Sequence, residues 1–384
     1  MSAGIFKYFF SYIFRSKTRQ KLIFLSIIGL LISSFSLVVL QGVMGGLQNG
    51  LITRSKHVLG NAYIDVVGVE RSELKKIFKK LDDHSIKYIK ELELELMAKH
   101  ENYIAPTIIH GMDFSNFIPE FIRHKDKTGV VVGGDLGRNL RAFFGSELII
   151  TSPAHTQVLI REIPMKSKST VTDFYSSELP EIDVIHAWVR LSFLQNLIRK
   201  RSINRIRFFE QPISQIEDAI DGLNLKLITW EDEHSTLVFA LNLETKVMLF
   251  LFIGTSLLIG ICISSAFIIF YNKIKLDLAS FWILGLSRDK ALSLVYSFGQ
   301  VISIIFCLLG VCLGLGFLYL LQTNQFIFMP DYFVERNIPV KIEMLHVFIS
   351  FFVPYSVSLI FTFFTFRTFK QENMSFMNLI RKVG

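Results

Sequence analysis

Residues 271–290 read YNKIKLDLASFWILGLSRDK and lie between two long apolar runs of the chain. The apolar middle of this segment, residues 276–286, would rise only about 16 Å as an α-helix, which is too short for the roughly 30 Å hydrocarbon core of a bilayer. One face of its helical wheel carries Leu276, Ala279, Ile283 and Leu286. Phe281 and Leu284 point elsewhere, so the helix would be apolar on more than one face. We therefore expect a short helix covered on one side by its own membrane bundle and on the other by a separate cytosolic protein. An interfacial helix lying in lipid headgroups is the alternative.

The rest of the chain is strongly apolar and contains four stretches long enough to cross a bilayer. Hydrophobic residues make up 51% of the sequence, which includes 37 Phe, and the mean hydropathy is +0.43. A soluble domain would be less apolar. Apolar length predicts transmembrane helices at residues 22–46, 247–271, 291–321 and 345–367. The first run is longer than the apolar part of a signal peptide, and no clean cleavage site follows it, so we expect an uncleaved helix.

The positive charge of the chain follows a pattern along the sequence. The net charge is +8, from 41 Lys and Arg against 33 Asp and Glu. Bases exceed acids in segments 1–21, 272–290 and 368–384, whereas the loop 322–344 has more acids than bases. The positive-inside rule places both termini and segment 272–290 in the cytoplasm, and residues 47–246 and the loop 322–344 outside. We therefore expect a multi-pass protein of the inner (cytoplasmic) membrane that contacts membrane lipids and no nucleic acid.

The two cytoplasmic ends differ in pattern. The aromatic-rich residues 1–21 predict an interfacial helix that leads into the first span. Residues 368–384 predict a cytoplasmic tail.

The segment 47–246 mixes strand and helix patterns, which predicts an α+β domain inserted between the first and second membrane helices. Strand patterns occur at residues 61–67, 91–99, 103–110, 146–151, 170–175, 182–189 and 226–229. Helical spacing occurs at residues 71–83, 191–200 and 215–223. The cysteines Cys262, Cys307 and Cys312 all lie in predicted membrane helices, so we expect this domain to fold without disulfides.

Small residues are spaced along the first two predicted membrane helices. They are Ser26, Gly29, Ser33 and Ser36 on the first helix and Gly254, Gly260 and Ser264 on the second. Such spacing is typical of close helix packing in lipid, and the lining of a cavity is the functional alternative. No Asp, Glu, Lys or Arg lies near the middle of a predicted span, which disfavours ion-coupled transport.

Motifs of catalysis and cofactor binding are absent from the sequence. There is no phosphate-binding P-loop, no H-E-x-x-H or C-x-x-C motif, and no G-x-S-x-G nucleophile motif. The 9 His residues are not at metal-ligand spacing. We therefore expect a non-catalytic chain that binds no metal and no cofactor itself. Any ATP and Mg²⁺ would be bound by a partner subunit.

Six stretches of the sequence resemble one family in their order and spacing. They are GLITRSKHVLGNAYIDV (50–66), GSELIITSP (145–153), IPMKSKSTVTDFYSSELPEIDV (163–184), ALNLETKVMLFLF (240–252), DLASFWILGLSRDK (277–290) and DYFVERNIPV (331–340). Together with the layout of one span, a large outside domain and three further spans, they resemble the LolC/LolE-type permeases of lipoprotein-releasing ABC transporters, in the wider MacB and FtsX family. The end of the chain departs from that family, because Asn373 and Met374 stand where a Pro is expected.

The resemblance implies a fold, a function and a set of partners. It implies a MacB-like core in the periplasmic α+β domain of a permease subunit. The complex would extract lipoproteins from the outer leaflet of the inner membrane, driven by ATP hydrolysis on a separate subunit. The implied partners are a cytosolic LolD-like ABC ATPase subunit, a second permease subunit, a periplasmic LolA-like lipoprotein carrier and the lipoprotein substrate. An FtsX-like mechanotransmitter that controls a cell-wall hydrolase and a MacB-like exporter of peptides or toxins are the alternatives. The sequence leaves open whether the chain is C-like, E-like or hybrid, whether the dimer is homo- or heterodimeric, which lipoprotein is the substrate, and the direction of flux.

The resemblance also implies two sets of functional residues. The coupling helix 272–290 would contact the ATPase through Asp277, Phe281, Trp282, Leu284, Gly285 and Arg288. The hook-like loop 152–168 would dock the carrier through the bounding Pro153 and Pro164 and the apolar tip Val158, Leu159 and Ile160. A plain β-hairpin loop is the alternative for this second segment.

Overall fold

The computed structural model describes residues 8, 9, 11, 21–122, 129–157, 163–223, 225–323 and 338–371. The chain divides into two compact units. Unit 1 comprises Met1–Asn49 and Ala240–Gly384, and unit 2 comprises Gly50–Phe239. Unit 2 corresponds to the predicted outside domain 47–246, with bounds that differ by a few residues.

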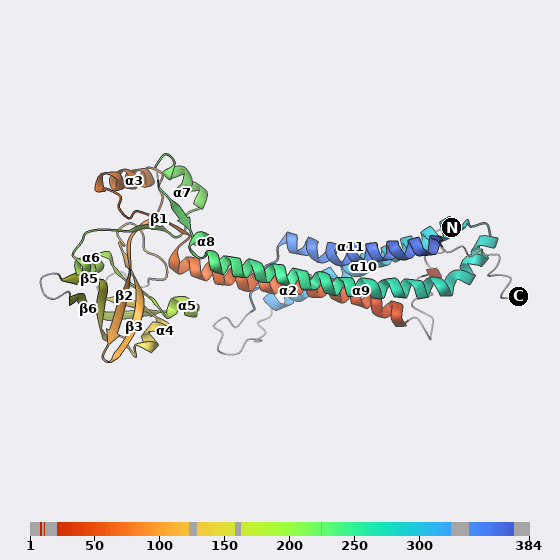
Figure 1. The fold of residues 1–384 in the computed structure, drawn as a ribbon, viewed down its shortest axis with the longest axis horizontal. Coiled ribbons are helices and arrows are strands. Elements are labelled where there is room, and N and C mark those ends of the chain that lie inside the picture. Colours follow the sequence, from red (N-terminus) through yellow and green to blue (C-terminus); the bar gives the residue numbers. More distant parts are fainter. Residues whose placement is uncertain are drawn as a thin grey trace. The chain divides into compact units, whose positions relative to one another are not determined.

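Four long helices in the described part of the chain are apolar enough to cross a membrane. They are α2 (Lys21–Leu59), α9 (Ser235–Ile283), α10 (Arg288–Thr323) and α11 (Met344–Gln371) (Figure 1). This confirms the prediction of four membrane-spanning helices with a sheet-containing segment between the first two. The sides of the membrane on which the loops and termini lie stay a prediction.

Two of these helices extend beyond the predicted spans. α2 continues past residue 46 to Leu59, and α9 begins at Ser235 and continues to Ile283. The glycines near the end of the first span do not interrupt α2. They allow a close approach instead, because a Cβ on Gly46 would lie only 2.0 Å from the carbonyl oxygen of Pro339. Both helices contribute residues to unit 1 and to unit 2.

Unit 2 is built on a nine-stranded sheet. The strands are β1 (Ala62–Asp65), β2 (Ile89–His100), β3 (Tyr103–Met112), β4 (Val130–Gly133), β5 (Glu147–Gln157), β6 (Ile163–Tyr175), β7 (His186–Arg190), β8 (Arg205–Phe208) and β9 (Leu227–Thr229). Their order is β3-β7-β4-β6-β5-β2-β8-β1-β9, and β3 also pairs with β2. The strands β2, β3, β7, β4, β6 and β5 therefore close into a ring, and β8, β1 and β9 extend from it.

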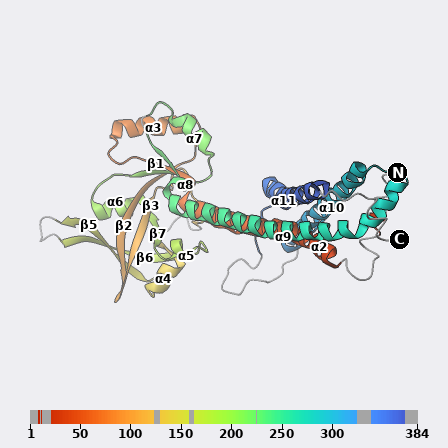
Figure 2. The same cartoon turned by 45° about the vertical axis from the view of Figure 1, so that its right-hand side comes forward.

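Strand β2 joins the ring to this extension, because it pairs with three strands. It pairs with β3 along most of its length, with β5 near its end and with β8 at its start. Helices α3 (Arg71–Asp83) and α7 (Ile213–Ile220) lie together beside β1 in both views (Figures 1 and 2). They bury Ile77, Leu81 and Ile216 against the extension. Helix α6 (Leu191–Ile198) buries Leu194 and Leu197 in the core of the ring.

The short elements of unit 2 include those that the sequence predicted least well. The strand predicted at 182–189 is wrong in its first part, because Pro180 starts the short helix α5 (Pro180–Asp183) and only His186–Arg190 form a strand. The sequence did not predict β4, β8, α4 (Gly134–Asn139) or α8 (Trp230–Glu233). The helix predicted at 71–83 is present with both ends correct, and the other strands and helices predicted in this domain are present with shifted ends.

Candidate functional site

The predicted coupling helix 272–290 is not a separate helix. Its first part forms the last turns of α9, which end at Ile283, and α10 begins at Arg288. The separate helix was a wrong expectation, because neither Pro nor Gly occurs between residues 272 and 283 to interrupt α9. The six predicted contact residues accordingly divide between two helices and a turn. Asp277, Phe281 and Trp282 lie on α9, Leu284 and Gly285 lie in the turn, and Arg288 starts α10.

Gly285 ends α9 in a tight turn. Its φ is +98°, a backbone conformation that residues other than glycine rarely adopt. Its N–H donates to the carbonyl of Trp282 (2.9 Å), and the N–H of Leu286 donates to the carbonyl of Phe281 (3.1 Å). This pair of bonds is the Schellman pattern of a helix C-terminus. The turn therefore has a defined backbone, and it fixes the direction in which α10 leaves.

The end of α9 has a buried side and an exposed side. Ile274, Leu278 and Ala279 are buried in a core that also contains residues of α10. The exposed fraction is 64% for Ile283 and 70% for Leu284. Ile283 lies on the same face of the helical wheel as Ala279 but is exposed, because it is the last residue of α9 and lies where the chain turns away.

Two residues of the N-terminal segment pack against this end of α9. The Tyr8 hydroxyl donates to Oδ2 of Asp277 (2.9 Å), and its ring meets that of Phe281 edge-on at 5.9 Å between centroids. Phe9 is fully buried and packs in the same core. Most of the predicted interfacial helix 1–21 lies outside the described residues. Sequence reasoning missed the Tyr8 contact, which gives Asp277 a partner within its own chain.

The small residues of the first membrane helix face α9. The contacts are Ser26 Oγ to the carbonyl of Cys262 (3.3 Å), a Cβ built on Gly29 to Ile259 (3.6 Å), and Ser33 Oγ to Ser256 Oγ (3.4 Å). The two helices lie side by side along this stripe in both views (Figures 1 and 2). Ser36 is half-buried, and no hydrogen bond is recorded for its side chain among the described residues.

The small residues of the second membrane helix have different neighbours. Gly260 lies close to α11, since a Cβ there would come within 2.7 Å of Val357 Cγ1. Ser264 Oγ lies 2.5 Å from Thr365 Oγ1. Gly254 faces open space in the described part of the chain. The arrangement places Gly260 and Ser264 in a helix interface and Gly254 on an open surface of α9.

The predicted hook is the far part of the β5–β6 hairpin. The last residue of β5 that pairs with β2 is Thr151, so from Ser152 onward the recorded ladder partners of β5 are residues of β6. Pro153 lies at an irregularity of this ladder, and Pro164 pairs with Thr156. The hairpin projects from the sheet in both views (Figures 1 and 2). The predicted apolar tip, Val158, Leu159 and Ile160, lies outside the described residues.

Sequence reasoning missed a buried cluster of charges in unit 2. Arg207 is 1% exposed and pairs with Glu91, with Glu93 (2.9 Å) and with the carbonyl of Leu59. His110 Nδ1 donates to Glu91 Oε1 at 2.6 Å. The available signal was the alternation of acids in β2 and of arginines in β8, since alternate strand residues share a face.

The cluster neutralises its own charges. Glu91, Glu93 and His110 offer ligand atoms within 4.8 Å of one another, but the Arg207 guanidinium pairs with both carboxylates. Burial by itself raises the pKa of Glu91, but the charge of Arg207 and the hydrogen bond from His110 outweigh burial and lower this pKa. The geometry therefore suits a structural ion network better than a metal site.

The chain resembles a known transmembrane protein over most of its length. No family model matches the chain. The chain is similar to the lipoprotein-releasing system transmembrane protein LolC of Buchnera aphidicola subsp. Schizaphis graminum (strain Sg), with 22% identity over 349 residues. The match covers 86% of each protein, so it includes both units. This similarity supports a relation of the chain to the LolC-like permeases.

Proposed function

We propose that the chain is the membrane permease subunit of an ABC-type lipoprotein-releasing complex. In this proposal it takes lipoproteins from the outer leaflet of the inner membrane and passes them to a periplasmic LolA-like carrier. ATP hydrolysis on a separate LolD-like subunit drives the transfer, and a second permease subunit completes the membrane part. The similarity to LolC over most of both chains supports this function.

The structural observation that carries the proposal is the turn between α9 and α10. Ile283 and Leu284 are exposed apolar side chains on a defined backbone, and the neighbouring Leu278 is fully buried. Exposed apolar side chains next to a buried part of the same helix are typical of a contact with another protein. We assign this surface, together with Phe281, Trp282 and Arg288, to the contact with the cytosolic ATPase.

The course of α9 supplies a route for coupling. One uninterrupted helix runs from Ser235, in unit 2, to Ile283 at the turn. A displacement of the turn would therefore move a helix that packs on α2 through Ser33 and on α11 through Ser264. Changes in these helix contacts would alter the space available to a lipid between the membrane helices.

The energetics of lipid transfer explain why a dedicated path is needed. At ~0.8 kcal/mol per CH₂, exposing three acyl chains of about 15 methylenes each to water would cost roughly 36 kcal/mol. The substrate lipid must therefore stay shielded from the membrane to the carrier. Uncharged membrane helices and a projecting hairpin beyond Ser152 suit such a path, with the hairpin as the docking element for the carrier.

The proposal is tested by purification of the full chain with its ATPase subunit in detergent without ATP. We expect an acylated protein to co-purify, detected by mass spectrometry, and ATP to release it. The variant Leu284→Asp should retain the bound lipoprotein but fail to release it, because the ATPase contact is lost.

Val67→Asp serves as the matched control, since Val67 is an exposed apolar residue of unit 2 (71%). This variant should behave like the unmodified chain. Absence of any acylated protein from the ATP-free complex would refute the proposed function.

A further inference from the structure

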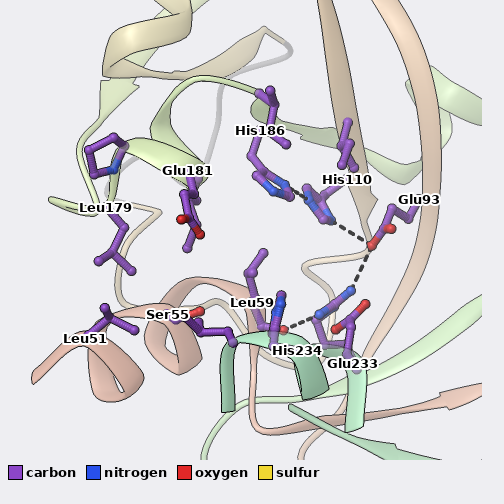
Figure 3. Close-up of a pocket in the computed structure, with 16 residues that line it drawn as sticks. Leu51, Ser55, Leu59, Glu93, His110, Leu179, Glu181, His186, Glu233 and His234 are labelled. Atoms are coloured by element: carbon purple, nitrogen blue, oxygen red, sulfur yellow. Dashed lines mark hydrogen bonds and ion pairs between the residues drawn. The ribbon is translucent and has the colours of Figure 1, made fainter. Parts of the chain in front are cut away.

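Unit 2 contains a cavity of about 390 Å³ next to the buried charge cluster. Its walls combine two kinds of side chain. The apolar ones are Leu51, Leu59, Ile108, Leu179, Ile182, Ile185 and Leu237. The polar ones include Glu181, Glu233, His186 and His234 (Figure 3). This size and this mixture are typical of a small-molecule site, in which few polar groups orient a mostly apolar ligand.

The charges around the cavity do not balance. Four carboxylates, of Glu91, Glu93, Glu181 and Glu233, lie in its wall or directly behind it. Two guanidiniums, of Arg205 and Arg207, pair with three of these carboxylates. Glu181 has no recorded ion pair among the described residues and is exposed at the edge of the cavity. With His110 counted as positive, since it pairs with Glu91 at 2.6 Å, the formal excess is one negative charge, and the Glu181 carboxylate is available to a ligand.

Two imidazoles add hydrogen-bonding atoms without adding positive charge. Burial and the charge of His110 lower the pKa of His186 to about 3, and burial lowers the pKa of His234. His234 Nε2 is buried and has no hydrogen-bond partner among the described residues. A buried polar atom without a partner is uncommon, and a ligand or water commonly supplies one. Figure 3 shows the His186 ring and the Glu181 carboxylate pointing into the same space.

From this combination we propose that the cavity binds a small primary alkylamine in its ammonium form. The ammonium group donates to the Glu181 carboxylate and to Nε2 of His234, and the alkyl part packs against Leu51, Leu59 and Leu179. A carboxylate ligand would be repelled by the excess of acids, and an alcohol would lack the charge that strengthens the hydrogen bond to Glu181. This site is independent of lipoprotein release and of the α9–α10 turn.

The tryptophans of the chain supply the readout. The sequence has 3 Trp. Trp188 stacks on His186, and Trp230 packs on His234 with ring centroids 4.9 Å apart. In the Trp282→Phe variant, both remaining tryptophans contact imidazoles of the cavity, so their fluorescence reports its occupancy.

The experiment titrates this full-length variant in detergent with n-hexylamine, 1-hexanol, hexanoate and hexyltrimethylammonium. We expect saturable binding of hexylamine and weaker binding of the other three, because none combines a positive charge with N–H donors. Adding Glu181→Gln should weaken hexylamine binding about fivefold. Adding Glu217→Gln, at an exposed position of α7, should leave it unchanged and also controls for partition into micelles.

The proposal is overturned by any of three results. Hexylamine gives no saturable signal, hexanol or hexanoate binds within about twofold of hexylamine, or Glu181→Gln binds hexylamine as tightly as Glu217→Gln.

Discussion

The turn between α9 and α10 exposes apolar side chains, whereas the cluster around Arg207 buries charged ones. At the turn, apolar Leu284 is 70% exposed, whereas in the cluster charged Arg207 is 1% exposed. Removing an exposed apolar side chain changes the free energy of unfolding little, but removing one partner of a buried ion pair leaves an uncompensated charge. The difference indicates that the turn is available to a partner and that the cluster serves the folding of unit 2.

The largest effect on stability is expected from Arg207→Met. This change leaves Glu91 buried without its guanidinium, while Glu93 keeps Arg205, and we expect unit 2 to lose about 3–5 kcal/mol of unfolding free energy. Hydrogen exchange of the amides of β2 and β8 in the full chain measures the loss. Arg201→Met is the control, because Arg201 is exposed. Unchanged protection in Arg207→Met would mean that the cluster contributes little to the fold.

The stability of unit 2 should also decrease as the pH is lowered, because of His186. Its pKa is lowered from 6.5 to about 3 in the folded protein, so the unfolded chain binds a proton more readily. The contribution of neutral His186 is complete above about pH 6.5 and is lost as the pH falls toward about 3. Between about pH 7 and about pH 5 we expect a loss of about 2 kcal/mol.

Unfolding of the full chain by urea at the two pH values, followed through Trp188, measures this dependence. The variant His186→Phe keeps an aromatic ring beside Trp188 and removes the titrating group. Its pH dependence should be flatter over the same range. An equally steep dependence in His186→Phe would assign the effect to other groups, such as His234, whose pKa is also lowered by burial.

A smaller effect is expected in the membrane bundle, where close packing at small residues takes the place of buried ion pairs. A Cβ on Gly310 would lie 2.4 Å from the carbonyl oxygen of Leu31, whereas a Cβ on Gly316 would meet no atom within 4 Å. Gly310→Ala should therefore cost about 1–3 kcal/mol through displacement of α2. Gly316→Ala should be neutral or stabilise by up to about 1 kcal/mol. Thermal unfolding in detergent compares the pair, and equal midpoints would contradict the close packing of α2 on α10.

The parts of this structure that the sequence predicted are those set by local pattern. Long apolar runs predicted the four helices, and the spacing at residues 71–83 predicted α3 with both ends correct. The closure of the sheet was not predictable in this way, because the pairing of β2 with β5 and of β3 with β7 joins residues distant in the sequence. Strand β8 has only 4 residues, so its alternation of arginine with apolar residues is too short to stand out from the neighbouring loops.

The α9–α10 turn and the cavity of unit 2 also differ in how far the sequence indicated them. The sequence singled out segment 272–290 as a contact region because its apolar residues are contiguous, but it predicted a separate helix there and not the turn between α9 and α10. The exposure of its residues was not predicted either, since the burial of Leu278 and the exposure of Ile283 depend on the neighbouring α10. The cavity of unit 2 was not predicted at all, because its walls come from segments as distant as Leu51, His110, Glu181 and Leu237.

The central claim, that the exposed turn contacts the ATPase, is tested most directly by cross-linking. A photo-reactive amino acid replaces Leu284 in the full complex, and in a matched complex it replaces Phe250. Phe250 is equally exposed (75%) but lies within the membrane-spanning part of α9. As a separate control, the variant Leu284→Asp should shift the free energy of unfolding by less than about 0.5 kcal/mol. Loss of the ATPase contact in this variant would then not be caused by unfolding. We predict a cross-link to the ATPase subunit from position 284 and none from position 250. A cross-link from position 284 to lipid alone, or equal ATPase cross-links from both positions, would contradict the account.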